Sequence, residues 1–199
     1  MMETVLRQGL SALSLPEEGV PALLRYWELL AEKNQVMNLT AITDPVDAAR
    51  LHFLDSAALP ALEDFRGKRV VDVGTGAGFP GLPLQILEPS IRLTLLDAQR
   101  KRVDFLREVC EDLGLADVEC VHGRAEAFAA DHREGFDIAV SRAVASLPVL
   151  AELCLPLVNV GGRFLAMKSV DTEEELNAAG RAVSLLGGRL EKPIDYVIS

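Results

Sequence analysis

Residues 70–81 read Val-Val-Asp-Val-Gly-Thr-Gly-Ala-Gly-Phe-Pro-Gly, and a helix-like apolar pattern over residues 82–87 follows directly. An apolar run that ends in glycines and a proline predicts a buried strand, a tight turn and the start of a helix. Glycine permits backbone dihedrals closed to other residues and lets a ligand approach the main chain. The free N–H groups of the helix start suit an anionic ligand group. We therefore expect a cofactor pocket at this turn.

The glycine spacing fits two kinds of cofactor. Residues 76–81 match the G-x-G-x-x-G fingerprint of dinucleotide-binding proteins, and Asp97 lies about 20 residues further on, where a ribose-binding acid is expected. The pattern D-x-G-x-G-x-G at residues 72–78 instead resembles motif I of the class I S-adenosylmethionine (AdoMet) methyltransferases. An NAD(P)-binding Rossmann oxidoreductase and a non-catalytic AdoMet-binding assembly module remain alternatives to a methyltransferase.

Composition bounds the class of protein. A chain of 199 residues with 49% hydrophobic residues can form one main domain with a small extension. There is no apolar run of about 18 residues and no N-terminal pattern typical of a signal peptide, so we expect a cytoplasmic protein without a membrane segment. The three cysteines and three histidines show no disulfide-framework or metal-ligand spacing, and we expect no metal.

The net charge of −10 argues against a general affinity for nucleic acid. A nucleic-acid substrate would need a local basic patch. Residues 100–107 hold the densest candidate, with Arg100, Lys101 and Arg102, and residues 66–69 hold a second. Solvated surface charges balanced by nearby acids explain each cluster equally well.

Hydrophobic periodicity predicts two helices within residues 3–34, separated by a turn at Pro16. A third helix should begin after the N-cap Asp44 and run to about Leu62, with Pro60 ending or kinking it. We assign residues 1–64 to an N-terminal helical extension and residues 65–199 to an AdoMet-binding domain.

From residue 68 the predicted strands alternate with helices, which favours a mostly parallel sheet with helices on both faces. Strands are expected at 69–73, 91–97, 118–121, 136–141, 162–168 and 189–198. Helices are expected at 82–87, 99–113, 146–157 and 172–186, the last with a capping box over residues 171–174.

In open parallel sheets the ligand binds at the carboxyl ends of the strands. The second strand ends in Asp97, whose carboxylate can accept both ribose hydroxyls of AdoMet or can cap the following helix. Backbone groups of Ala125 and Glu126, after the third strand, can hold the adenine edge. Arg142 and Lys168 end the fourth and fifth strands.

Six motifs in order carry a specific resemblance: Asn38-Leu-Thr40, His52-x-x-Asp55-Ser56, the glycine turn, Lys101-Arg-x-x-Phe-Leu106, Arg124-Ala-Glu126 and Ser141-Arg-Ala143. They resemble the ribosomal small-subunit methyltransferase G family, also called glucose-inhibited division protein B. The resemblance implies a class I AdoMet-methyltransferase Rossmann-like fold. It also implies transfer of a methyl group from AdoMet to N7 of a guanine in the 530 loop of bacterial 16S rRNA, within naked rRNA or a small-subunit particle.

The resemblance and the glycine turn together give the expected cofactor contacts: Asp72, Gly74, Thr75, Gly76, Gly78, Phe79, Asp97, Ala98, Ala125, Glu126 and Arg142. The expected RNA contacts are Arg100, Lys101, Arg102, Arg142 and Lys168. Of these, Arg142 and Lys168 should position the substrate, because guanine N7 already carries a lone pair and needs no general base. Pairing with acids at the sheet end is their alternative role.

Three points of the resemblance remain open. Asn38, His52, Asp55 and Ser56 either close a lid over the pocket or satisfy one another beneath the N-terminal helices, and we favour the second. Ser169 stands where the family commonly has glycine. The chain ends at Ser199, short of the family's final strand, which predicts a smaller sheet or a truncation. We expect a monomer.

Overall fold

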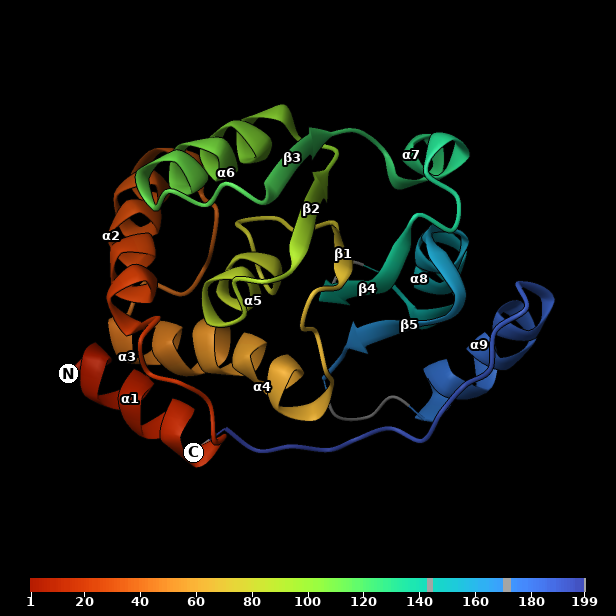
Figure 1. Ribbon diagram of the computed structural model, residues 1–199, viewed down its shortest axis with the longest axis horizontal. Coiled ribbons are helices and arrows are strands. Elements are labelled where there is room, and N and C mark those ends of the chain that lie inside the picture. The colour runs from red at the N-terminus through yellow and green to blue at the C-terminus, as the bar shows by residue number, and fades with distance from the viewer. Residues whose placement is uncertain (143–144, 170–172, 199) are drawn as a thin grey trace.

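The computed structural model describes residues 1–142, 145–169 and 173–198. A parallel five-stranded sheet lies between two layers of helices (Figure 1). Its strands are β1 (Arg69–Val73), β2 (Arg92–Asp97), β3 (Val118–His122), β4 (Phe136–Arg142) and β5 (Val158–Met167). The helices are α1 (Met2–Ala12), α2 (Val20–Met37), α3 (Pro45–Ala48), the π-helical turn η1 (Ala49–Leu54), α4 (Asp55–Leu62), α5 (Gly81–Leu87), α6 (Arg100–Asp112), α7 (Ala125–Asp131), α8 (Leu147–Cys154), the 3₁₀ turn η2 (Leu155–Leu157) and α9 (Glu173–Leu185).

The strand order is β3-β2-β1-β4-β5, so the winding direction reverses between β1 and β4. All four strand pairs are parallel, and the register places Asp97 opposite His122 and Arg142 opposite Met167. The carboxyl ends of the five strands therefore meet at one edge. A crevice at such a reversal is where ligands bind in open parallel sheets.

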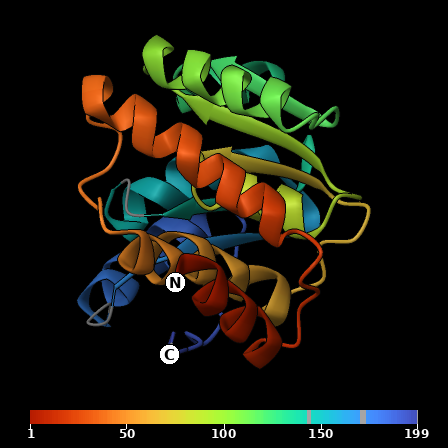
Figure 2. The same cartoon turned by 90° about the vertical axis from the view of Figure 1, so that its left-hand side faces the viewer.

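The sheet is apolar on both faces because helices cover both. Val70 and Leu95 belong to a core with α1, α2, η1, α4, α5 and α6, the layer that faces the viewer in Figure 2. Val71 and Leu96 point the other way, into a core with α7 and α8. This double coverage explains why β1 reads as a continuous apolar run rather than an alternating one.

The N-terminal helices share the first core with the sheet, since Leu6, Leu23 and Phe53 lie in the same cluster as Val70. At the surface of this core, two ion pairs join α2 to α6: Arg25 to Asp112 at 2.8 Å and Lys33 to Glu108 at 2.6 Å. We propose that residues 1–64 are an extension of one domain that does not bury its apolar side chains alone.

Most of the expected elements are confirmed. The helix over residues 45–62 is present with a π-helical turn inside it, and Asp44 caps it by accepting from the backbone N–H of Val46 at 2.8 Å. Pro60 lies inside its last segment, which ends at Leu62. β5 begins at Val158, earlier than expected, and its pairing with β4 is irregular at the start. The capping box over residues 171–174 lies partly outside the described residues.

Two predictions about secondary structure differ from the fold. The strand expected at 189–198 is wrong, because these residues are irregular; Pro193 within the run lacks an N–H for a sheet ladder. The short helix α7 was not expected.

The described helices include none that is both long enough and apolar enough to cross a membrane.

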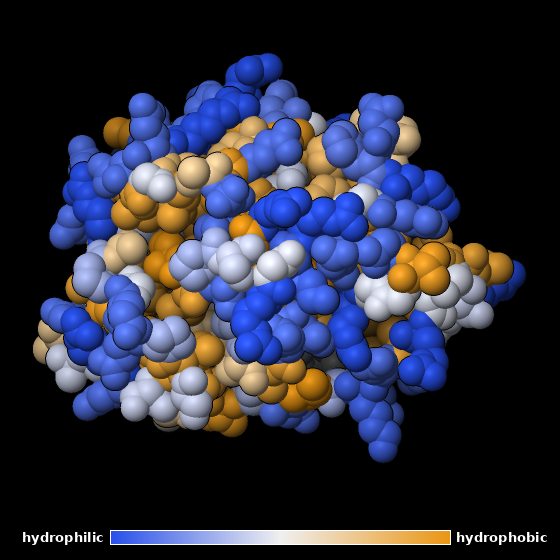
Figure 3. All heavy atoms as spheres, in the orientation of Figure 1, coloured by the Kyte–Doolittle hydropathy of each residue, from blue (hydrophilic) through white to orange (hydrophobic). Residues whose placement is uncertain are grey.

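Polar side chains cover much of the face seen in Figure 3, and an apolar patch lies at the α9 end. Leu185, at the end of α9, is 78% exposed.

Candidate functional site

Asp72 holds the glycine turn together. Its carboxylate is fully buried, and its Oδ2 accepts from the hydroxyl of Thr75 at 2.7 Å and from the backbone N–H of Gly81 at 2.9 Å. These two bonds join the end of β1, the turn and the start of α5. Its Oδ1 is buried without a hydrogen-bond partner among the described residues. Burial raises the pKa of this carboxyl to about 6.

The glycines of the turn serve different purposes. Gly76 has φ +62°, and a Cβ placed on it would meet no atom within 4 Å. A Cβ on Gly78 would lie 2.5 Å from the hydroxyl of Tyr26, and one on Gly81 would lie 2.8 Å from Oδ2 of Asp72. Gly78 and Gly81 therefore allow close packing, and only Gly76 among these three opens onto space that a ligand can occupy.

Asp97 connects β2 to both neighbouring loops. Its Oδ2 accepts from the N–H of Gly76 at 2.9 Å, and its Oδ1 accepts from the N–H of Gln99 at 2.8 Å, just before α6. The helix-capping alternative is wrong, because the N-cap of α6 is Gln99 and no side chain among the described residues caps this helix. A carboxylate has about four lone-pair positions, so the bonds from Gly76 and Gln99 leave room for ligand hydroxyls.

The segment after β3 lies beside Asp97, because the N–H of Gly123 donates to the carbonyl oxygen of Asp97 at 3.0 Å. Ala125 and Glu126 begin α7 directly afterwards. Exposed Ala98 is close by, with its carbonyl oxygen 3.2 Å from Nε2 of His122. The expected ribose and adenine contacts therefore come from adjacent segments.

Arg142, the last residue of β4, binds three groups of the N-terminal extension. Its Nη1 donates to Oδ2 of Asp55 at 2.9 Å and to the carbonyl oxygen of Leu51 at 3.1 Å, and its Nη2 lies 3.1 Å from Nδ1 of His52. Its guanidinium carbon lies 5.2 Å from the ring centre of Phe79 in the glycine turn. The side chains of Arg142 and Asp55 are only 17% and 25% exposed.

His52 and Asp55 therefore meet on Arg142 and form no hydrogen bond with each other. Because an arginine can only donate, Nδ1 of His52 must accept and Nε2 carries the proton. That Nε2 lies 2.8 Å from the hydroxyl of Thr40, and the ring stacks on Phe79 at 4.5 Å. Burial, with the nearby charge of Arg142, lowers the pKa of His52 to about 4. The imidazole is neutral at pH 7.

The other residues of these two motifs have local roles. Ser56 donates its hydroxyl to the carbonyl oxygen of His52 at 2.6 Å. Asn38 ends α2 with φ +50°. It lies outside the Arg142 cluster, by which we mean Arg142 with Leu51, His52 and Asp55. Residue type alone gave no sign that His52 and Asp55 would contact a strand-end arginine.

The model of the rRNA small subunit methyltransferase G family matches residues 20–193. The chain belongs to this family. Ribosomal RNA small subunit methyltransferase G from Alkaliphilus metalliredigens is 46% identical over 191 residues, covering 94% of this chain and 80% of that protein. The protein of the same name from Acetivibrio thermocellus is 47% identical over 186 residues, covering 92% and 76%.

Solved structures agree with the fold. An AdoMet-dependent methyltransferase from Aquifex aeolicus superposes with a TM-score of 0.55 at 18% identity, covering 78% of this chain and 89% of that one. This likeness shows a Rossmann-like fold. The family relationship makes the chain an rRNA methyltransferase, and the oxidoreductase alternative is set aside.

The two basic clusters of this methyltransferase lie at opposite edges of the sheet. Arg100 and Lys101 are exposed at the start of α6, directly after the carboxyl end of β2, and Arg102 lies 3.6 Å from Asp97. The second cluster, at residues 66–69, precedes and begins β1 and so lies at the opposite edge. Only the first cluster borders the expected cofactor site.

Lys168 lies just past β5 and is 18% exposed. Its Nζ donates to the carbonyl oxygen of Ala145 at 2.9 Å and pairs with Oε2 of Glu175 on α9 at the same distance. Glu175 also accepts from the N–H of Leu147 at 3.1 Å. In this structure Lys168 therefore helps to hold α8 and α9 together.

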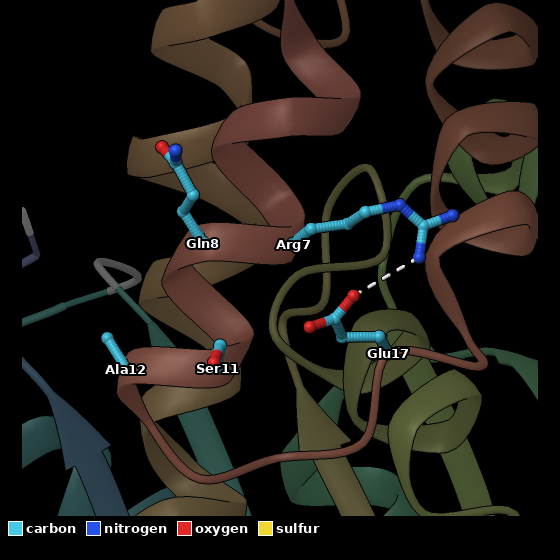
Figure 4. A pocket seen from close by; sticks show the side chains of 5 residues that line it. All are labelled: Arg7, Gln8, Ser11, Ala12 and Glu17. Atoms are coloured by element: carbon cyan, nitrogen blue, oxygen red, sulfur yellow. Dashed lines mark hydrogen bonds and ion pairs between the residues drawn. The ribbon is translucent and has the colours of Figure 1, made fainter.

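A hollow of about 470 Å³ lies between α1 and the segment before α2, away from the strand ends (Figure 4). The side chains that line it are Arg7, Gln8, Ser11, Ala12 and Glu17. Arg7 and Glu17 pair across it at 3.2 Å. It contains none of the expected site residues. No group of three or more metal-ligating side chains gathers anywhere in the described ranges.

Proposed function

We propose that this methyltransferase transfers a methyl group to N7 of a guanine in the 530 loop of bacterial 16S rRNA, within naked rRNA or a small-subunit particle. One observation carries the proposal beyond the family relationship. Arg142 ends the strand beside the glycine turn, and three protein groups fix its guanidinium there.

The residues present fit AdoMet. Gly76 leaves open space beside the turn, and the carboxylate of Asp97 borders it with unused lone-pair positions. When bound, AdoMet supplies an electrophilic methyl group. The proposed contacts are Asp72, Gly74, Thr75, Gly76, Gly78, Phe79, Asp97, Ala98, Ala125, Glu126 and Arg142. Within this set, Asp72 and Gly78 act through the shape of the turn, because both are committed to buried protein contacts.

The chemistry requires alignment rather than proton removal. Guanine N7 has an in-plane lone pair, so no proton must leave before it attacks. Holding the reacting atoms nearly collinear can contribute roughly 7–11 kcal/mol through proximity and orientation. Neutral His52 is bonded on both ring nitrogens, to Arg142 and Thr40, and this agrees with a site that uses no general base.

Arg142 keeps donors for a substrate. A guanidinium has five N–H groups, and the contacts with Asp55, Leu51 and His52 use three of them. The Nε–H and one N–H of Nη2 have no partner among the described residues. This edge suits a phosphate or a guanine O6. Bonding to N7 itself would occupy the attacking lone pair, so we assign O6 or phosphate.

Labelled methyl transfer to small-subunit RNA, with mapping of the modified base, tests the proposal. Arg142→Ala should lower the single-turnover rate at saturating RNA, because it removes an aligned donor. The matched variant Lys101→Ala should weaken RNA binding and leave that rate near the wild-type value. Methyl label on another base would contradict the proposed reaction. Equal, near-wild-type rates for the two variants would contradict the proposed role of Arg142.

A further inference from the structure

The C-terminal segment returns to the N-terminal helices. After α9 the chain runs irregularly along the molecule and ends beside α1 (Figure 1). The segment is held on either side of Tyr196: Glu191 pairs with Arg163 of β5 at 2.8 Å, and Ile198 packs against the core that contains the N-terminal helices. Tyr196 lies between these anchors.

Tyr196 contacts the Arg142 cluster from outside. Its hydroxyl donates to Oδ1 of Asp55 at 2.8 Å, across a sequence separation of 141 residues. The other oxygen of the same carboxylate, Oδ2, accepts from Arg142 at 2.9 Å. Asp55 therefore bridges the C-terminal segment and the strand-end arginine, with one oxygen committed to each.

Fixing both oxygens matters because the terminal torsion of an aspartate is broad when only one oxygen is held. A carboxylate that rotates would change the direction from which it accepts, and the guanidinium of Arg142 would follow. The side chains of Asp55 and Arg142 are mostly shielded from water. Hydrogen bonds in such a shielded place are electrostatically stronger than at the surface. Burial also raises the pKa of the Tyr196 phenol, which keeps it a donor at neutral pH.

We propose that Tyr196 and Asp55 are positioning residues that orient the guanidinium of Arg142 toward the RNA substrate. The inference rests on the role proposed above for Arg142. It assigns the C-terminal segment a part in the reaction although the segment contributes no strand to the sheet. Tyr196 and Asp55 act through Arg142 and touch neither cofactor nor reacting atoms.

The first test is Tyr196→Phe, which removes the hydroxyl and keeps the ring. The variant loses one hydrogen bond to the charged Asp55, and we expect part of this loss to change the orientation of Arg142. The single-turnover rate at saturating RNA and AdoMet should therefore fall about threefold to tenfold. AdoMet affinity and melting temperature should stay near the wild-type values. Ile194→Ala is the matched control, because Ile194 lies on the same segment, is 63% exposed and is not one of the Asp55 contacts.

A double-mutant cycle with Asp55→Ala, which removes both acceptor oxygens, separates a relay from two independent effects. Once Asp55 is changed, Tyr196→Phe should lower the rate no further. The same rate factor in both backgrounds, or a wild-type rate for Tyr196→Phe, would overturn the inference. Should Asp55→Ala fail to fold, the comparison of Tyr196→Phe with Ile194→Ala decides.

A readout without activity keeps the inference separate from the proposed function. The NMR signal of the Arg142 Nε–H should shift or broaden in Tyr196→Phe and stay unchanged in Ile194→Ala. An unchanged Arg142 signal in both variants contradicts the relay even if the enzyme is active. A wild-type protein that methylates no guanine N7, together with a shifted signal in Tyr196→Phe, contradicts the proposed reaction and leaves the Tyr196–Asp55–Arg142 relay supported.

Discussion

The hydroxyl of Tyr26, in the middle of α2, donates to the carbonyl oxygen of Ala77 inside the glycine turn. The tyrosine is fully buried, and its ring stacks near Phe79 with centres 5.3 Å apart. The N-terminal extension thus packs against the glycine turn and hydrogen-bonds to it. Gly78 of the same turn also packs closely against the Tyr26 hydroxyl.

Tyr26→Phe should weaken AdoMet binding. The variant keeps the ring but leaves a buried carbonyl oxygen unpaired, which costs about 1–3 kcal/mol. Part of that cost should appear as lower stability and part as a less ordered turn. Calorimetric titration with AdoMet and urea unfolding measure the two. Lower stability with unchanged AdoMet affinity would show that Tyr26 supports only the fold.

Gly76→Ala should lose AdoMet binding at a small cost in stability. The new Cβ meets no protein atom, so it enters the space assigned to the ligand. Gly114→Ala is the matched control: Gly114 has φ +65°, against +62° for Gly76, and its Cβ is equally free, but it lies after α6, far along the chain from the turn. Both variants should destabilise the fold by about 1–2 kcal/mol through the left-handed backbone. Equal AdoMet affinities in the two variants would contradict the assigned position of the cofactor.

Asp72→Asn should stabilise the protein at neutral pH and impair its turn. The folded-state pKa of about 6 lies above the ordinary 3.8, so the buried carboxylate loses stability as pH rises through 6, by about 3 kcal/mol in all. Asparagine removes that charge and therefore the loss. Unfolding measured at pH 5 and pH 8 should show a gain about twice as large at pH 8, because the loss begins near pH 3.8 and is complete only above pH 6. AdoMet affinity should fall, because the bonds to Thr75 and Gly81 weaken without the charge. A gain of equal size at both pH values would show that burial does not raise the pKa of this carboxyl above 5.

His52 should make the protein less stable in mild acid. Its folded-state pKa of about 4 lies below the ordinary 6.5, so its contribution is complete above pH 6.5 and is lost as pH falls toward 4. In His52→Asn this part of the pH dependence should be absent, since an amide oxygen can still accept from Arg142 without titrating. Denaturant unfolding of both proteins between pH 7.5 and pH 4.5 makes the comparison. Parallel curves would assign the acid sensitivity to other groups.

Arg100→Ala should weaken RNA binding and flatten its dependence on salt, because one phosphate contact is lost. The matched control is Arg92, which begins β2 at the opposite edge of the sheet and is also exposed. Arg92→Ala should leave affinity and salt slope unchanged. Equal losses in the two variants would mean that RNA responds to the mean charge of the protein rather than to one edge of the sheet.

The parts of the fold that were predictable are those with local causes. Buried parallel strands such as β1 are continuous apolar runs bounded by glycine turns, and caps such as Asp44 mark helix starts within a few residues. The helix α7 offered little such signal, because its seven residues include only one large buried side chain, Phe128. The false strand at 189–198 has an apolar run that the fold does not bury: Ile194 and Val197 are 63% and 90% exposed, whereas Ile198 packs against the core.

The sequence predicted which residues of the site lie at strand ends, but it did not predict which side chains they contact. Asp97 and Arg142 follow from their places after apolar runs. The bond from Arg142 to Asp55 spans 87 residues, and the bond from Tyr196 to Asp55 spans 141, so neither has a signature in local spacing. Both depend on how α4 and the C-terminal segment pack on the finished sheet.

The core shared by the extension and the sheet also sets the order in which a nascent chain can mature. Leu6, Leu10 and Leu23 leave the ribosome first, but the same cluster includes Val140 and Met167, which are synthesised much later. Short helices without a packing partner are marginal in water. The N-terminal helices must therefore wait, with their apolar faces uncovered, until most of the chain has been made. Until Val140 and Met167 have been synthesised, part of this apolar surface is open to chaperones and to aggregation.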